Sequence, residues 1–107
     1  MKFDLEATIK GMVLAVRDSV EKDYGEAEYV SRLFLEANKN RYQKLVDFRL
    51  AGKIDDQNFQ SRLNDEKLML EAQLNTLAII SKVKAQNAAN AAFEVLESAV
   101  KSCLNLV

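Results

Sequence analysis

The sequence predicts an all-α domain: an antiparallel helical hairpin with a long C-terminal helix that either self-associates or folds back into a four-helix bundle. Its 107 residues include no proline, three glycines and many Ala, Leu, Glu, Lys and Gln residues, which are strong helix formers. Hydrophobic residues make up 49% of the chain, which suits a folded core and is too high for a disordered segment. We therefore expect a single helical domain, residues 1–107, in which glycines mark the breaks.

The first helix is expected over residues 5–24. Asp4 is a suitable N-cap residue, because its carboxylate can accept a hydrogen bond from a free backbone N–H of the first turn. Gly11 lies inside the helical pattern, where it is either merely tolerated or allows a neighbouring helix to approach closely. The apolar residues of this segment form one stripe at helical spacing: Leu5, Ile9, Met12, Val13, Val16 and Val20.

The second helix is expected over residues 26–51. Glu26 and Glu28 lie in its first turn, where carboxylates favour the positive end of the helix dipole, and Gly52 follows its end as the C′ residue. The apolar stripe is interrupted at residues 38–41. Its expected buried face consists of Val30, Leu33, Phe34, Ala37, Leu45 and Phe48.

The turn after this helix is the clearest local signal in the chain. Asp55 is placed to cap the next helix. Ile54 before it and Phe59 four residues after it are placed for a hydrophobic staple. Because the connection is so short, the two helices that it joins are expected to lie antiparallel and adjacent.

The third helix is expected to start at residue 55 and run to about residue 105, because no glycine or proline occurs in that stretch. Its apolar and small residues follow an 11-residue repeat, which keeps them on one helical face, and Glu66 is the one misfit. Reflecting Gly25 across residue 53 places it opposite Ser81, so a break near residues 81–90 would allow a compact four-helix bundle. Helix propensity favours the continuous helix instead, and with it self-association.

Residues 72–93 are the segment expected to carry the main contact surface. They contain two charges and seven alanines, and a helix so poor in charge is usually buried on more than one side. Three interpretations stay open: packing inside a bundle, a seam between copies of the chain, or a groove for a foreign helix. The predicted seam consists of Leu70, Leu74, Leu77, Ala85, Ala88, Ala92, Leu96 and Ala99.

The charge is unevenly distributed, although the net charge is only −1. Residues 29–53 hold six cations and two anions, whereas the segments on either side are net acidic. This pattern fits pairing of charges within the chain or between subunits, and it also fits a surface for an acidic partner. The cations of that candidate surface are Lys39, Arg41, Lys44, Arg49 and Lys53.

The composition argues against several kinds of chemistry. The chain has no histidine, which is the commonest general base and a common metal ligand, and its single cysteine cannot form a metal cluster. The three glycines are too far apart for a phosphate-binding loop. We therefore expect no enzyme activity, no metal and no cofactor. Nucleic-acid binding by the basic middle helix is disfavoured because Arg41, Lys44 and Arg49 do not share one helical face.

The expected location is the cytoplasm. A single cysteine fits a reducing compartment, no apolar run is long enough to cross a membrane, and Asp4 and Glu6 interrupt the place of a signal peptide. The expected function is a non-enzymatic helical protein–protein interaction or assembly module, most simply a homo-oligomer, or one with a helical or acidic protein partner. The alternatives are a compact bundle that binds a small apolar ligand and, third, a nucleic-acid-binding protein.

Overall fold

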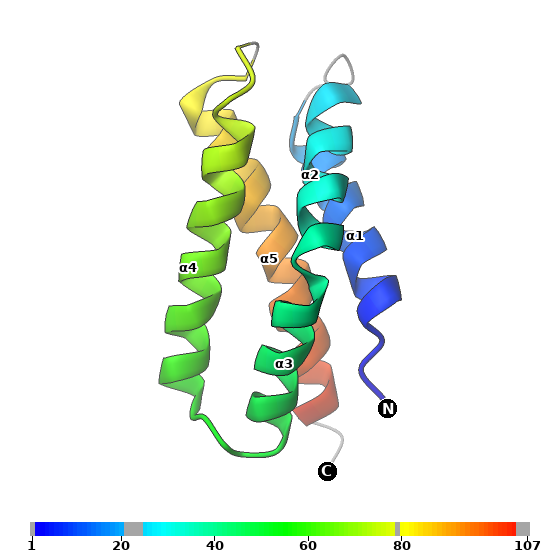
Figure 1. The fold of residues 1–107 in the computed structure, drawn as a ribbon, viewed down its shortest axis with the longest axis vertical. Coiled ribbons are helices and arrows are strands. Elements are labelled where there is room, and N and C mark those ends of the chain that lie inside the picture. The colour runs from blue at the N-terminus through cyan, green and yellow to red at the C-terminus, as the bar shows by residue number, and fades with distance from the viewer. Residues whose placement is uncertain (1, 21–24, 79, 105–107) are drawn as a thin grey trace.

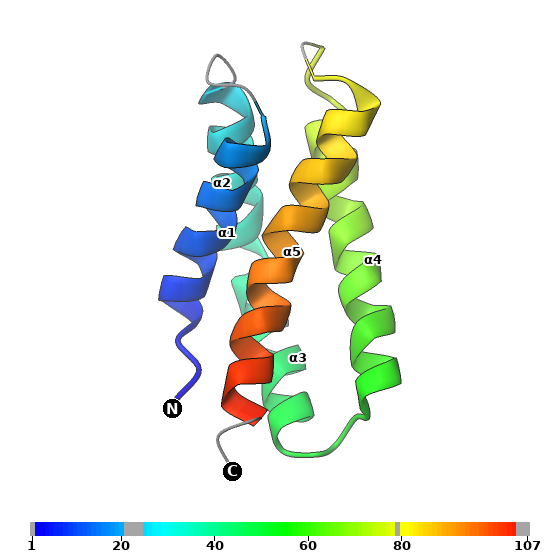
Figure 2. The ribbon, with the colours of Figure 1, turned by 180° about the vertical axis from the view of Figure 1, so that it is seen from behind.

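The computed structural model describes residues 2–20, 25–78 and 80–104, and it confirms the all-α fold. Those residues form five helices that run up and down the long axis of the molecule, with α3 continuing α2 along one side (Figures 1 and 2). The radius of gyration is 13.7 Å, close to the about 13 Å expected for a compact domain of this length. The helices are α1 Leu5–Ser19, α2 Gly25–Ala37, α3 Lys39–Leu50, α4 Asp56–Leu74 and α5 Lys82–Leu104.

The expected continuous helix over residues 55–105 is wrong, and the folded-back alternative is the one that forms. The helix stops at Leu74, and a new helix starts at Lys82. The Thr76 hydroxyl donates to the carbonyl of Gln73 at 2.6 Å, and the Ser81 hydroxyl accepts the backbone N–H of residue 84 at 3.1 Å. Such local hydrogen bonds compete with a continuing helix, and burial of the α5 apolar face against α1 and α4 favours the reversal.

The expected second helix, residues 26–51, is divided at Asn38. Its side-chain amide donates to the carbonyl of Phe34 at 2.8 Å, which is a hydrogen bond that competes with the backbone ladder. The carbonyl of Asn38 then accepts the backbone N–H of Arg41 at 3.0 Å, where the next helix begins. The division therefore falls within the stretch where the apolar stripe is interrupted.

The predicted caps are confirmed. Asp4 and Asp55 each accept a backbone N–H of the first turn, at 3.1 and 2.8 Å. Gly52 has a φ of +74° and donates to the carbonyl of Arg49, while the N–H of Lys53 reaches the carbonyl of Phe48 at 2.8 Å. This pair of bonds is the Schellman arrangement that a C′ glycine favours. The first helix is shorter than expected, because it ends at Ser19 and the backbone of Val20 is extended. The remaining residues of the expected first and third helices, 21–24 and 105, lie outside the described residues.

Helix α5 crosses the middle of the bundle and packs most extensively on α1 (Figure 2). A Cβ atom added at Gly11 would lie 3.1 Å from Cγ1 of Val95, so this glycine serves close packing. The small residues of α5 also let the two helix backbones come close together. Its fully buried alanines are Ala85, Ala88, Ala89 and Ala92.

Candidate functional site

The residues of the predicted seam lie in the interior of the single chain. Six of the eight are buried, and Leu77 and Ala99 are half-buried. They pack against helices of the same chain, because α5 is enclosed by α1, α3 and α4. The six buried side chains therefore stabilise the bundle and are not available as a surface in this fold.

The expected buried face of the second helix is wrong in part. The side of α2 that faces the core carries Ala27, Ser31 and Leu35, all fully buried. The expected stripe is rotated away from it, so that Leu33 is 52% exposed and Phe48, farther along in α3, is 41% exposed. The bundle selects the face with the smallest side chains, which lets α2 lie close to its neighbours. Large apolar residues are left at the surface as a result.

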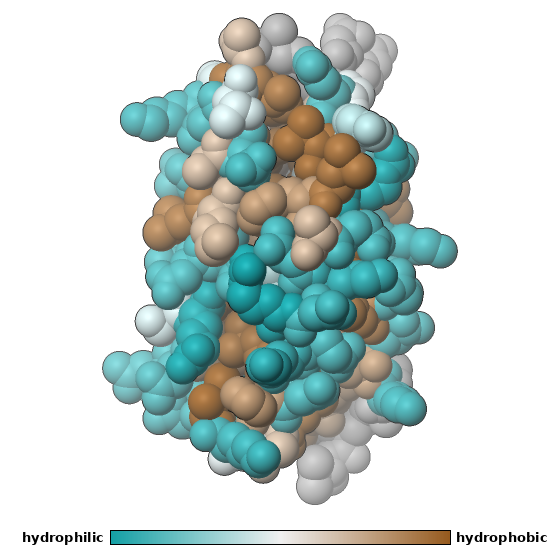
Figure 3. Space-filling view, in the orientation of Figure 1, coloured by the Kyte–Doolittle hydropathy of each residue, from teal (hydrophilic) through white to brown (hydrophobic). Residues whose placement is uncertain are grey.

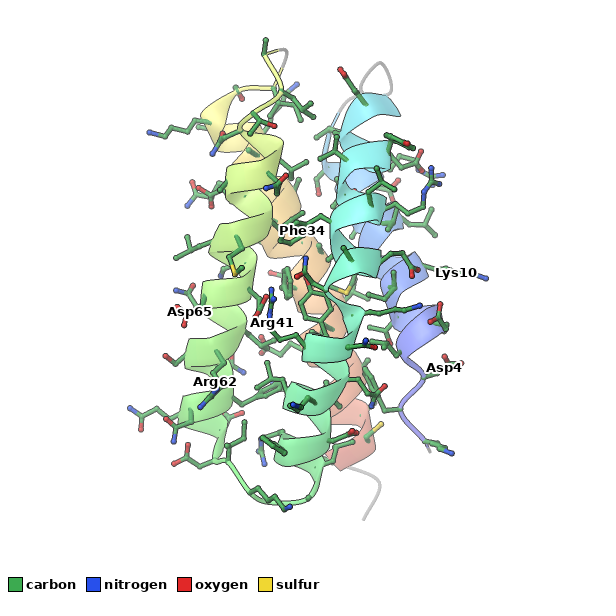
Figure 4. All side chains as sticks on the ribbon, viewed as in Figure 1. Asp4, Lys10, Phe34, Arg41, Arg62 and Asp65 are labelled. Atoms are coloured by element: carbon green, nitrogen blue, oxygen red, sulfur yellow. The ribbon has the colours of Figure 1, made fainter. Side chains whose placement is uncertain are left out.

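Leu33 belongs to an apolar surface that we call the α2–α4 patch. It consists of Val30, Leu33, Phe34 and Ala37 on α2, together with Met69 on α4. The four α2 residues share a face through spacings of three and four, and Figure 4 places Phe34 between the two helices. Figure 3 shows apolar side chains gathered over the upper halves of α2 and α4, above a hydrophilic band.

Below the patch, α3 and α4 enclose a cleft of about 190 Å³. This α3–α4 cleft has an apolar part, to which the side chains of Leu45 and Phe48 contribute, and a charged rim. The cleft is smaller than the about 300–1,000 Å³ typical of ligand pockets, so it suits a protruding side chain better than a whole small molecule. It is lined by Arg41, Lys44, Leu45, Phe48, Arg62, Asp65 and Glu66.

An ion pair closes the upper end of this cleft. The guanidinium of Arg41 reaches across from α3 and donates to both carboxylate oxygens of Glu66, at 2.6 and 2.5 Å (Figure 4). Glu66 is only 8% exposed. Its hydrogen bonds hold the pKa of Arg41 above the usual value. The one misfit of the 11-residue repeat is thus a buried carboxylate with a bidentate partner.

Three of the five cations of the predicted acidic-partner surface form ion pairs within the chain. Besides Arg41, Lys39 contacts the carboxylates of Glu6 and Glu36 at 3.4 and 3.2 Å. Those two carboxylates hold the pKa of the Lys39 ammonium above its usual value, with the hydrogen bond to Glu36 the larger cause. Arg49 lies 3.9 Å from Asp56 across the turn.

The other two cations are placed differently. The Lys53 ammonium lies 5.8 Å from the centre of the Phe48 ring, within reach of a cation–π contact. Lys44 lines the cleft, and among the described residues no carboxylate lies within ion-pair distance of it. The structure therefore does not join all five residues into one surface.

Sequence reasoning missed Arg62, which lines the cleft from α4 and also has no ion-pair partner among the described residues. The helical spacing of α4 contains a pattern that could have pointed to it. Arg62 and Met69 are seven residues apart and so lie on the same face of α4, as do Glu66 and Met69, which are three apart. Only the pairing of α4 with α2 and α3 shows that this face borders the patch.

The other hollows are larger, but they are more polar or shallower. A polar cleft of about 490 Å³ between α4 and α5 is lined by amides and charged groups such as Asn64, Lys67, Asn90 and Glu94. A shallower hollow of about 330 Å³ lies at the α1–α5 end, where the half-buried thiol of Cys103 is found. In the described parts of the chain, no group of three or more potential metal ligands occurs, and no helix is long and apolar enough to cross a membrane.

The fold and these surfaces define an all-α antiparallel bundle with one partly apolar, partly basic face. Comparison with protein-family models, curated proteins and solved structures finds no match to this chain.

Proposed function

We propose that this chain is a non-enzymatic protein–protein interaction module that docks a helical segment of a partner on the α2–α4 patch. The observation that carries the proposal is the joint exposure of Leu33 and Met69, at 52% and 44%, beside the half-buried ring of Phe34. Single exposed apolar residues are ordinary at protein surfaces. A contiguous group on two adjacent helices is typical of a contact surface.

The proposal places the contact surface on a different face from the predicted seam. Burial of Ala85, Ala88 and Ala92 inside the chain leaves them no part in a contact between copies. The α2–α4 patch suits the docking of a helix, because apolar side chains lie on two neighbouring helices that pack on one another. A partner helix laid there would remove the exposed parts of Leu33 and Met69 from water.

Site-specific photocrosslinking in cells that make the protein tests this proposal. A photoreactive phenylalanine analogue replaces Leu33 in one variant and Leu68 in the other. Leu68 is a matched control, because it is 51% exposed on α4 and does not belong to the patch. We expect a discrete crosslinked product from position 33 and none from position 68.

The mass of that product separates a foreign partner from a second copy of this chain. Equal products from both positions, or no product from position 33, would overturn the proposal.

A further inference from the structure

We infer that the occupant of this face is an acidic amphipathic helix, whose apolar side covers the α2–α4 patch and whose carboxylates reach Lys44 and Arg62 in the α3–α4 cleft. This inference rests on the proposed function, and it names the chemistry of the partner. The two surfaces lie on one face of the molecule, since α3 continues α2 opposite α4 (Figures 1 and 3). One helix lying between α2–α3 and α4 would therefore contact both.

The charges of the cleft favour an anion. Three cations and two carboxylates line it, but Glu66 is occupied by both of its hydrogen bonds to Arg41. Lys44 and Arg62 then remain without an ion-pair partner among the described residues, and only Asp65 opposes them. A partner carboxylate would find two cations on facing helices, partly shielded from water by Leu45 and Phe48.

The spacing along the helices predicts the pattern of the partner. Lys44 is eleven residues beyond Leu33, about 16 Å at the rise of an α-helix, and Arg62 is seven residues before Met69, about 10 Å. A partner helix therefore needs apolar residues at i and i+3 or i+4, and acidic residues about two to three turns away on the same side.

A second copy of this chain does not meet these requirements. Each helix in the described part of the chain already packs in the bundle, and the buried apolar residues of all five contribute to a single core. A copy could therefore offer no free amphipathic helix. It could only place its own folded surface, such as the same patch, on this one.

Selection from a phage-displayed library of helical peptides tests the inference. The peptides are about 18 residues long, roughly 27 Å as a helix, with one face randomised, and the full chain is the target. We expect enrichment of an apolar stripe followed by Asp or Glu after about two to three turns.

Variants of the chain locate the binding of a selected peptide. Affinity is expected to fall about tenfold or more for the double variant Lys44→Glu, Arg62→Glu and for Leu33→Asp. It is expected to stay unchanged for Lys10→Glu, an exposed cation on α1, and for Leu68→Asp (Figure 4). A peptide whose acidic residues are replaced by lysine should prefer the double variant, and thermal unfolding checks that each variant is folded.

The outcomes are distinct. Apolar peptides without acidic residues that lose affinity for Leu33→Asp would overturn the inference and leave the proposed function standing. Failure to enrich peptides, or enriched peptides that are insensitive to Leu33→Asp, would also overturn it, while crosslinking from position 33 decides the proposed function independently.

Discussion

The contact between α1 and α5 and the face between α2–α3 and α4 are built from different side chains. At the first, Gly11 meets Val95, and alanines such as Ala88 and Ala92 are completely buried. At the second, the large side chains of Leu33 and Met69 are about half exposed beside a cleft. Small residues close the first contact by letting the backbones approach, whereas the second face is only partly closed.

This difference shows how poorly hydrophobicity alone separates a core from a contact surface. The segment with the least charge, residues 72–93, supplies core residues for its own chain. The segment with the most positive charge carries the exposed apolar patch beside its cations. The size of the apolar residues distinguishes the two, because alanine stabilises a close helix contact, and an exposed leucine contributes little to folding.

Replacing one core leucine and one patch leucine by alanine gives the largest expected difference in the free energy of unfolding. Leu96 is fully buried on α5, so Leu96→Ala is expected to lower the free energy of unfolding by about 4 kcal/mol, through lost burial and the cavity that it leaves. Leu33→Ala on the patch is expected to change it by less than about 0.5 kcal/mol. Urea unfolding followed by circular dichroism measures both. Equal losses would show that the patch is part of the core.

Replacing Arg41 and replacing Glu66 are expected to change the free energy of unfolding by different amounts. Arg41→Met leaves a buried carboxylate without its partner, and we expect a loss of about 3 kcal/mol in the free energy of unfolding. Glu66→Leu restores the apolar repeat, and the guanidinium of Arg41 can turn to water, so the stability should be unchanged or higher. Similar losses for both variants in chemical unfolding would mean that the pair itself is strongly stabilising.

Enlarging an alanine of α5 tests whether its small residues serve the fold. Ala92→Leu is expected to lower the free energy of unfolding by about 2 kcal/mol through overpacking, with no change of molar mass. Light scattering behind a sizing column and urea unfolding supply the two measurements. A fall in molar mass at unchanged stability would instead assign Ala92 to a contact between copies of the chain.

Local signals predicted much of the fold. Asp4, Asp55 and Gly52 each have the capping role expected from their chemistry. The reflection of Gly25 onto Ser81 also predicted a reversal, although helix propensity argued for continuity. The break falls between Leu74 and Lys82, so it touches only the start of the expected range of residues 81–90. Propensity is a sum of local preferences, and here burial of the α5 face against other helices outweighs it.

The candidate site was harder to predict, because it depends on which helices become neighbours. Helical spacing placed Leu33 and Phe34 on one face of the second helix, but it could not show that the bundle would bury the opposite face with Ala27 and Ser31. Likewise, Glu66 was recognised as a misfit, and only the position of α3 identifies Arg41 as its partner. Both gaps concern tertiary pairing, about which a single helical pattern carries no information.

The buried phenol of Tyr42 is another position in the interior where a gain in stability is expected. Its ring lies 5.7 Å from that of Phe93 in an edge-to-face arrangement, while its hydroxyl is buried and has no hydrogen-bond partner among the described residues. Tyr42→Phe keeps the ring contact and removes the unpaired group. We expect the free energy of unfolding to rise by about 1 kcal/mol at neutral pH.

The same residue links stability to alkaline pH. Burial, and to a lesser extent the carboxylate of Glu66, raise the pKa of Tyr42 above its usual value of about 10. Above that pH the unfolded chain loses the phenolic proton while the folded chain keeps it, so the stability present below about pH 10 declines as the pH rises. Urea titrations at about pH 8 to 11, a range that spans the phenolic pKa, measure this decline. The Phe variant should lack the part that is due to Tyr42. A parallel decline in both proteins would mean that folding does not change the pKa of Tyr42. An unchanged stability at neutral pH would mean that its hydroxyl finds a partner in solution.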